Sequence, residues 1–163
     1  MIKVLFVCLG NICRSPLAQG LLEKKIKELG LNDQMEVDSC GTSQYHIGEQ
    51  PDGRTVQNAL KNGIKLEHKA RQFSKKDFRV FDYIVAMDSA NMECIRRLDQ
   101  THEFSDKFML IRDFDAVDKG ADVPDPYFGG EEGFQQVFLI LQRSVNEFLN
   151  HVIQKHGLRV SVS

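Results

Sequence analysis

The residues with the clearest capacity for chemistry lie in one short segment, VCLGNICRSP at positions 7 to 16. It follows an apolar run that predicts a buried strand, and its proline suits the first turn of a helix. A helix N-terminus presents unpaired N–H groups and a partial positive charge. Gly10 and Asn11 tolerate the left-handed dihedrals with which a loop turns its own N–H groups inward. The segment therefore predicts a concave site for a tetrahedral oxyanion such as phosphate.

Three side chains of this segment could act on the bound anion. Arg14 offers a permanent charge and a planar fork that matches two phosphate oxygens. Cys8 begins the loop, and dipoles of this kind lower a cysteine pKa of ~8.5 to below ~7. Ser15 is the expected N-cap of the following helix, and its hydroxyl can also donate a hydrogen bond to the sulfur. A thiolate that faces a phosphoryl group is a nucleophile for covalent phosphoryl transfer, and the N–H cradle with Arg14 makes a metal ion unnecessary.

The elements that would position this loop alternate along the chain. Strands are expected at 2–7, 35–40, 82–87 and 107–111. Helices are expected at 16–29, at 54–62, after a capping box at 74–77, through Met92, Ile95 and Leu98, and along the apolar stripe from Phe134 to Val152. The alternation predicts a single-domain α/β fold with a four-stranded, parallel, doubly wound sheet and helices on both faces. Ligands bind such folds beyond the carboxyl ends of the strands, where the loop after the first strand lies.

Composition and charge narrow the class of protein further. The 163 residues fit one domain, expected over residues 1–156 with a frayed tail at 157–163. A net charge of −2 indicates neither a nucleic-acid-binding surface nor a basic patch that would bind a membrane. No apolar run approaches the ~20 residues of a membrane span, and no secretory signal is evident, so a cytoplasmic location is expected. Four cysteines (Cys8, Cys13, Cys40 and Cys94) in a chain of this length do not make a disulfide scaffold, so reduced thiols are expected, and no zinc-type pair occurs among them.

Two separated motifs resemble those of one enzyme family, the low-molecular-weight protein tyrosine phosphatases. VCLGNICRSP resembles the family signature, and VPDPYFGG at 123 to 130 resembles its general-acid loop. Shorter matches lie between them, at 38–39, 42–43, 68–72 and 81–84. The resemblance implies that Cys8 attacks phosphorus, that Arg14 holds the phosphoryl oxygens, and that Asp125 protonates the leaving phenolate and then activates water. It also implies phosphotyrosine proteins as substrates, inhibition by inorganic phosphate and other oxyanions, and no cofactor; a monomer is favoured.

The same resemblance implies supporting roles for other residues. Contacts to phosphate would come from the loop itself, at Leu9, Gly10, Asn11, Ile12, Cys13 and Ser15. The walls of the cleft, which would stack on an aryl ring, would be Tyr45, Tyr127 and Phe128. Ser39 and His68 would belong to a hydrogen-bond network that fixes the loop and tunes the thiolate. His68 is not expected to bind a metal, because no second histidine or carboxylate lies at ligand spacing.

Two further features can be interpreted from the residues themselves. Asp125 lies between Pro124 and Pro126, whose rings fix φ, so the segment is stiff enough to aim a carboxyl group. Cys13 could form a protective disulfide with Cys8 under oxidation, or it could simply pack as a thiol in the loop. Relatives often carry a second tyrosine where this chain has Phe128, which leaves Tyr127 alone as a candidate for regulatory phosphorylation.

Three alternative functions stay open. Arginine phosphatases on the same scaffold typically carry Thr after the loop asparagine, and Ile12 favours an aryl ring over a guanidinium. An arsenate reductase needs two further cysteines after the third strand, where only Cys94 lies. A phosphate-binding module without turnover predicts the loss of Cys8, Arg14 or Asp125, and all three are present.

Overall fold

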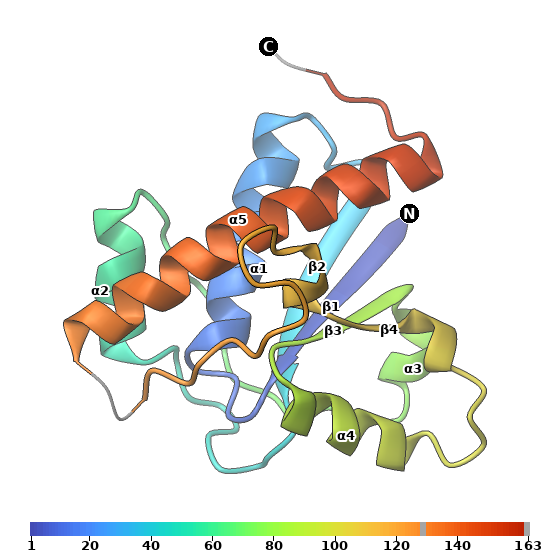
Figure 1. The fold of residues 1–163 in the computed structure, drawn as a ribbon, viewed down its shortest axis with the longest axis horizontal. Coiled ribbons are helices and arrows are strands. Elements are labelled where there is room, and N and C mark those ends of the chain that lie inside the picture. Colours follow the sequence, from blue (N-terminus) through green and yellow to red (C-terminus); the bar gives the residue numbers. More distant parts are fainter. Residues whose placement is uncertain (128–129, 162–163) are drawn as a thin grey trace.

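A four-stranded parallel sheet forms the centre of the computed structural model, which describes residues 1–127 and 130–161 (Figure 1). The strand order is β2-β1-β3-β4, and all three pairings are parallel. The strands are β1 (Ile2–Cys8), β2 (Met35–Gly41), β3 (Tyr83–Ala86) and β4 (Phe108–Leu110). The four predicted strands are therefore confirmed, each with ends within one residue of the expected ones.

The helices also follow the sequence pattern. They are α1 (Arg14–Glu28), α2 (Gly53–Lys61), α3 (Asp77–Val80), α4 (Ser89–Leu98) and α5 (Glu131–His156), with two short 3-10 helices, η1 (Ser105–Lys107) and η2 (Ile111–Phe114). The long apolar stripe of the last helix is buried, as its periodicity predicts.

Two expected helix starts are wrong in detail. Ser15 is not the N-cap of α1, because the helix begins at Arg14 and the N–H of Leu17, which a capping Ser15 would accept, bonds to the carbonyl of Cys13 at 3.3 Å. The Ser15 hydroxyl turns instead toward the sulfur of Cys8. At 74–77 one hydrogen bond of the expected capping box is present, since the carboxylate of Asp77 accepts the N–H of Ser74 at 2.9 Å, but α3 itself begins only at Asp77.

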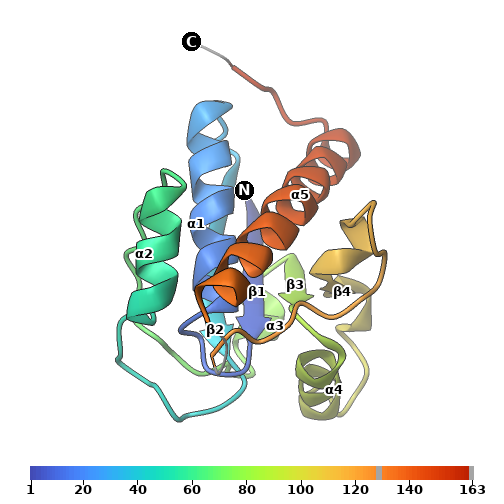
Figure 2. The same ribbon diagram turned by 60° about the vertical axis from the view of Figure 1, so that its left-hand side comes forward.

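Alternating side chains of the central strand β1 divide the core into two layers. Val4 and Phe6 belong to a cluster that includes residues of α1 and α5. Leu5 and Val7 belong to a second cluster, which includes Phe78 of α3 and other aromatic residues. Figures 1 and 2 show α1, α2 and α5 grouped together and α4 apart from them. Both faces of the sheet are thus covered, which confirms the doubly wound arrangement.

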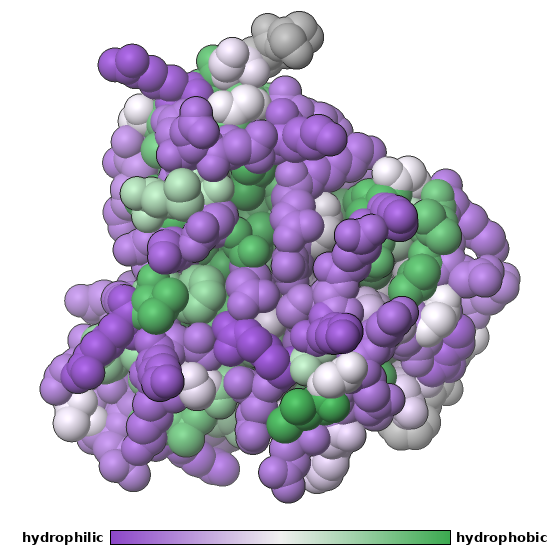
Figure 3. Space-filling view, turned by 180° about the vertical axis from the view of Figure 1, so that it is seen from behind, coloured by the Kyte–Doolittle hydropathy of each residue, from purple (hydrophilic) through white to green (hydrophobic). Residues whose placement is uncertain are grey.

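β1 lies between β2 and β3, so the chain continues from β1 to one side of the sheet, at β2, and then crosses to the other side for β3 and β4. This switch point places the loop after β1 beyond the carboxyl ends of the strands, where ligands bind in such folds. Seen from behind, the surface is mostly hydrophilic, with apolar residues in several separate patches (Figure 3). No helix in the described part of the chain is long and apolar enough to cross a membrane.

The C-terminal tail makes specific contacts after the C-cap of α5, Gly157, which has a left-handed φ of 59°. The N–H of Ser161 bonds to the carbonyl of Leu29 at 2.8 Å, and Arg159 exchanges two hydrogen bonds with Gln34. Residues 162–163 lie outside the described residues. A domain boundary at 156 and a frayed end therefore stay predictions.

Candidate active site

The phosphate loop, defined here as residues 8–15, turns at Asn11, which has a left-handed φ of 59°. At Gly10 a Cβ would lie 2.9 Å from Cδ2 of His46, so any larger residue would require the His46 side chain to shift. Gly41, at the end of β2, lets the loop pass close by, because a Cβ there would lie 2.7 Å from the carbonyl oxygen of Leu9. Sequence reasoning missed both His46 and Gly41, whose contacts depend on how the loop crosses neighbouring segments.

The sulfur of Cys8 is buried at the base of this loop. It lies 3.2 Å from the backbone N–H of Asn11 and 2.9 Å from the hydroxyl of Ser15. The positive end of α1 begins at Arg14, next to the same loop. Hydrogen bonds donated to a sulfur favour thiolate over thiol. The surroundings therefore suit an anionic sulfur.

The side chain of Asn11 determines which way the Ser15 hydroxyl donates. The N–H of Arg71 donates to Oδ1 of Asn11 at 3.0 Å, and this contact fixes the orientation of the amide. Nδ2 of Asn11 then donates to Oγ of Ser15 at 2.8 Å. The Ser15 proton is left for Cys8 at 2.9 Å, because the carbonyl of Cys40 is farther away at 3.4 Å.

His68 and Ser39 also form hydrogen bonds with this network. Nε2 of His68 lies 2.7 Å from Oδ1 of Asn11 and 3.2 Å from Oγ of Ser39. Burial lowers the pKa of His68, although Asp38 acts in the opposite sense, so the ring is neutral at pH 7. Because Oδ1 of Asn11 can only accept a hydrogen bond, the single ring proton lies on Nε2. Ser39 donates to Gln19 at 2.6 Å. Gln19 was missed, although its position four residues after Ser15 on α1 could have indicated it.

Arg14 is held from two sides and is almost fully buried. Its Nη1 donates to Oδ2 of Asp88 at 2.6 Å and to the carbonyl of Val123 at 3.0 Å. Its Nη2 lies 3.6 Å from Oδ2 of Asp125. Burial opposes the charge on Arg14, but Cys8 and Asp88 outweigh it and raise the pKa of the guanidinium. The cation therefore stays charged inside the protein.

Asp88 is a functional neighbour that sequence reasoning missed. It is the N-cap of α4, and its Oδ1 accepts the N–H of Asn91 at 2.7 Å. An aspartate before a helix is fully explained by capping. The contact of its second oxygen with Arg14 spans 74 positions and becomes visible only in the fold.

Asp125 lies in the acid segment, defined here as residues 122–127. Figures 1 and 2 show this orange segment passing close to the blue phosphate loop. Oδ1 of Asp125 accepts the N–H of Tyr127 at 3.0 Å, and Oδ2 faces Arg14. The side chain is 39% exposed. Its carboxyl group can therefore exchange protons with both a ligand and water.

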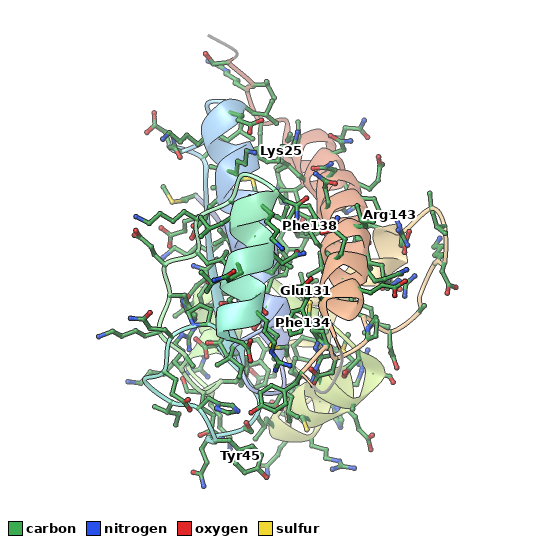
Figure 4. All side chains as sticks on the ribbon, turned by 90° about the vertical axis from the view of Figure 1, so that its left-hand side faces the viewer. Lys25, Tyr45, Glu131, Phe134, Phe138 and Arg143 are labelled. Atoms are coloured by element: carbon green, nitrogen blue, oxygen red, sulfur yellow. The ribbon has the colours of Figure 1, made fainter. Side chains whose placement is uncertain are left out.

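A cavity of about 240 Å³ connects the phosphate loop with the acid segment. Tyr45 projects outward at its edge (Figure 4), and the ring of His46 lies 6.1 Å from that of Tyr127. Phe128, the third expected wall residue, lies outside the described residues. A larger cavity of about 360 Å³ between α2 and the start of α5 contains neither the cysteine nor Arg14, so the smaller one is the candidate site. Its lining comprises Cys8, Leu9, Gly10, Ile12, Cys13, Arg14, Tyr45, His46, Asp125 and Tyr127.

The second cysteine of the loop differs from the first. Cys13 is buried, and burial is the main cause that raises its pKa to about 12. Its thiol therefore stays protonated at neutral pH and is a poor nucleophile. Both cysteines are free thiols in this structure, and a disulfide between them stays a prediction.

Within residues 1–127 and 130–161, no group of three or more histidine, cysteine, aspartate or glutamate side chains could hold a metal ion. The positive charge that faces the cavity comes from Arg14 and from the start of α1, and Asp125 lines the same cavity.

The first loop of a doubly wound sheet thus brings a buried cysteine and an arginine next to an aspartate from a distant segment, which defines an α/β protein with groups for nucleophilic and acid–base chemistry at one cavity. The family model described as low molecular weight phosphotyrosine protein phosphatase matches residues 3–158. The chain belongs to this family, and it is an enzyme of the phosphoric monoester hydrolase class.

Individual relatives agree with this assignment. The chain is 41% identical to the low molecular weight phosphotyrosine protein phosphatase of Schizosaccharomyces pombe, over 93% of this chain and 97% of the relative. It is similar to the crystal structure of a protein tyrosine phosphatase from Entamoeba histolytica, with a TM-score of 0.90 and 36% identity over 96% of this chain and 99% of the other. It is also similar to the structure of a Drosophila arginine phosphatase, with a TM-score of 0.85 and 34% identity over 93% and 98% of the two chains.

Proposed function

We propose that this protein hydrolyses phosphotyrosine in proteins, and small aryl phosphates, without a metal ion and through a cysteinyl-phosphate intermediate. Cys8 is the nucleophile, Arg14 the phosphate clamp and Asp125 the general acid and base. The observation that carries the proposal is the placement of all three side chains on one cavity, with a sulfur that receives hydrogen bonds from Asn11 and Ser15.

In the first step, the Cys8 thiolate attacks phosphorus. An S–P bond forms as the bond from phosphorus to the aryl oxygen breaks, and the carboxyl group of Asp125 gives its proton to the departing oxygen. The products are a phenol, an aspartate carboxylate and a phosphorylated cysteine. Arg14 and the N–H groups of the phosphate loop match the charge that the equatorial oxygens carry.

In the second step, the Asp125 carboxylate takes a proton from water, and the water oxygen attacks phosphorus. The S–P bond breaks, orthophosphate leaves, and Asp125 is again protonated. The sulfur is now the leaving group, and the hydroxyl of Ser15 at 2.9 Å stabilises the returning thiolate. Each residue thus ends the cycle in its starting state.

Hydrolysis of p-nitrophenyl phosphate in excess EDTA tests the proposal, together with acid quenching of a 32P-labelled aryl phosphate. We expect turnover that EDTA does not affect, and 32P bound to the protein in an acid-stable form at Cys8. Activity that requires a divalent ion, or label that Cys8→Ser leaves in place, contradicts the mechanism.

A second candidate substrate is phosphoarginine, because a structural neighbour of this chain is named an arginine phosphatase. Ile12 lines the cavity next to Cys13 and presents an apolar surface, which suits an aromatic ring better than a guanidinium. Two peptides that differ only in phosphotyrosine or phosphoarginine measure the preference. A higher kcat/KM for phosphoarginine would reverse the assignment of substrate.

The biological setting follows as prediction. Phosphotyrosine proteins are the expected partners, inorganic phosphate and other oxyanions the expected inhibitors, and the cytoplasm the expected location. A monomer remains the favoured state. The predicted inhibition by oxyanions is tested directly by measuring whether phosphate competes with p-nitrophenyl phosphate.

A further inference from the structure

The chain between η2 and α5 is organised around one buried arginine. The carbonyl of Arg112 accepts the N–H of Gly120 at 2.7 Å, and its Nη1 donates to the carbonyl of Asp122 at 2.8 Å. The side chain of Arg112 is 8% exposed. Backbone and side chain of one residue therefore hold the stretch that leads directly into the acid segment.

Arg112 is itself fixed by Asp115, whose carboxylate is fully buried. Nε of Arg112 donates to Oδ2 of Asp115 at 2.9 Å. Arg143 of α5 donates to both carboxylate oxygens, at 2.7 and 3.0 Å, and the N–H of Val117 donates to Oδ1 at 2.9 Å. The hydrogen bonds from Arg143 are the main cause that holds the pKa of the Asp115 carboxyl well below its usual range. Figure 4 labels Arg143 on α5, beside the chain that follows η2.

The contacts of the acid segment continue on its other side. The carboxylate of Asp122 accepts the N–H of Ser89 at 2.8 Å, and the N–H of Val123 donates to the carbonyl of Met87 at 2.9 Å. The carbonyl of Val123 accepts from Arg14. Arg112 thus holds the acid segment on the side away from the phosphate loop. Asp125 follows only three residues after Asp122, whose carbonyl accepts the hydrogen bond from Arg112. Prolines on both sides of Asp125 limit how the backbone could absorb a displacement.

We propose that Arg112 is a positioning residue for the general acid: it sets where the carboxyl group of Asp125 lies relative to the leaving oxygen. This inference rests on the proposed function of Asp125. A displacement of about 1 Å at a reacting group can cost on the order of 10²-fold in rate. Arg112 touches no substrate atom, and its effect passes through the Asp122 carbonyl.

A matched pair of substitutions isolates this link. Arg112→Met and Arg143→Met each remove one guanidinium from Asp115 and leave the other, but only Arg112→Met removes the donor to the acid segment. Phenyl phosphate releases a phenol with a pKa of about 10, as tyrosine does, and needs the general acid most. p-Nitrophenyl phosphate releases a better leaving group and needs it least.

We expect Arg112→Met to lower kcat/KM for phenyl phosphate roughly 10- to 100-fold, with a much smaller loss for p-nitrophenyl phosphate. Arg143→Met should keep the ratio of the two substrates near its wild-type value. Equal losses on both substrates with Arg112→Met would overturn the proposal, because general damage to the fold acts that way. A ratio change of the same size with Arg143→Met would overturn it as well.

A double-mutant cycle with Asp125→Asn separates this inference from the proposed function. With the acid already absent, Arg112→Met should cost little more on phenyl phosphate, and additive losses would contradict a role through Asp125. If Asp125→Asn alone has no effect, it is the assignment of the acid that fails. Should Arg112→Met not fold, Arg112→Lys keeps the charge but lacks the fork that spans Asp115 and Asp122, and the same change in ratio is expected.

Discussion

The phosphate loop and the acid segment hold their reactive groups in opposite ways. Cys8, Asn11, Ser15 and Ser39 are each at most 2% exposed, and side-chain hydrogen bonds join them into one network. The side chain of Asp125 is 39% exposed, and the acid segment is tied mainly through its backbone.

The difference matches the work that each region is proposed to do. A cradle that binds the same phosphoryl group through both steps gains from rigidity, because its dipoles then need no reorganisation. A group that passes protons to a leaving oxygen and takes them from water has to remain accessible to both. Rigid support of the backbone around a solvent-accessible carboxyl satisfies both requirements.

Cys8→Ser removes the nucleophile and should have the largest effect of any single change. A serine hydroxyl is hardly ionised at neutral pH, so we expect kcat for p-nitrophenyl phosphate to fall by at least about 10⁴-fold. Phosphate binding, followed by calorimetry, should persist, because Arg14 and the loop N–H groups remain. Turnover within tenfold of wild type would show that the sulfur is not the attacking atom.

Asp125→Asn tests the other region and should rank second. The amide keeps the shape of the side chain but cannot donate and recover a proton in the same way, so kcat/KM for phenyl phosphate should fall roughly 10²–10⁴-fold. Wild type should give a bell-shaped pH profile, and the variant should lose the limb that depends on a protonated carboxyl. Identical profiles in both proteins would remove Asp125 from the mechanism.

Ser15→Ala breaks one contact within the phosphate loop and should have a smaller effect. A hydrogen bond to a charged group contributes about 1.5–3 kcal/mol, which corresponds to roughly 10- to 150-fold in rate. Alkylation of Cys8 by iodoacetate at neutral pH should slow as well, since the thiolate loses a donor. Ser144→Ala, at another buried serine, is the control that should leave alkylation unchanged. Equal alkylation rates in Ser15→Ala and wild type would mean that the hydroxyl does not stabilise the sulfur.

The same contrast explains how far the sequence could predict the site. The phosphate loop is contiguous, so its turn residues, helix start and cysteine are read together, and the strands and helices follow from periodicity. Arg112 and Asp115 look like ordinary surface charges in sequence, and Asp88 looks like a cap. Their roles depend on contacts across the fold, such as the 28 positions between Asp115 and Arg143. Even in the loop, the assignment of Ser15 as a cap was wrong, because its hydroxyl bonds to Cys8 and Asn11 of the same loop instead of to the first turn of the helix.

Asp115→Asn should have its clearest effect on stability. The buried carboxylate has a folded-state pKa below the ~3.9 of the unfolded chain, so its stabilisation is fully present above pH ~4 and is lost as the pH falls through the folded-state value. At pH 7 the variant should lose about 1.5–3 kcal/mol in the free energy of unfolding. Urea midpoints measured from pH 7 down to acid should therefore converge for the two proteins below pH ~4. A difference between the two urea midpoints that stays constant over that pH range would mean that the shape of the Asp115 side chain, rather than its charge, stabilises its contacts with Arg112 and Arg143.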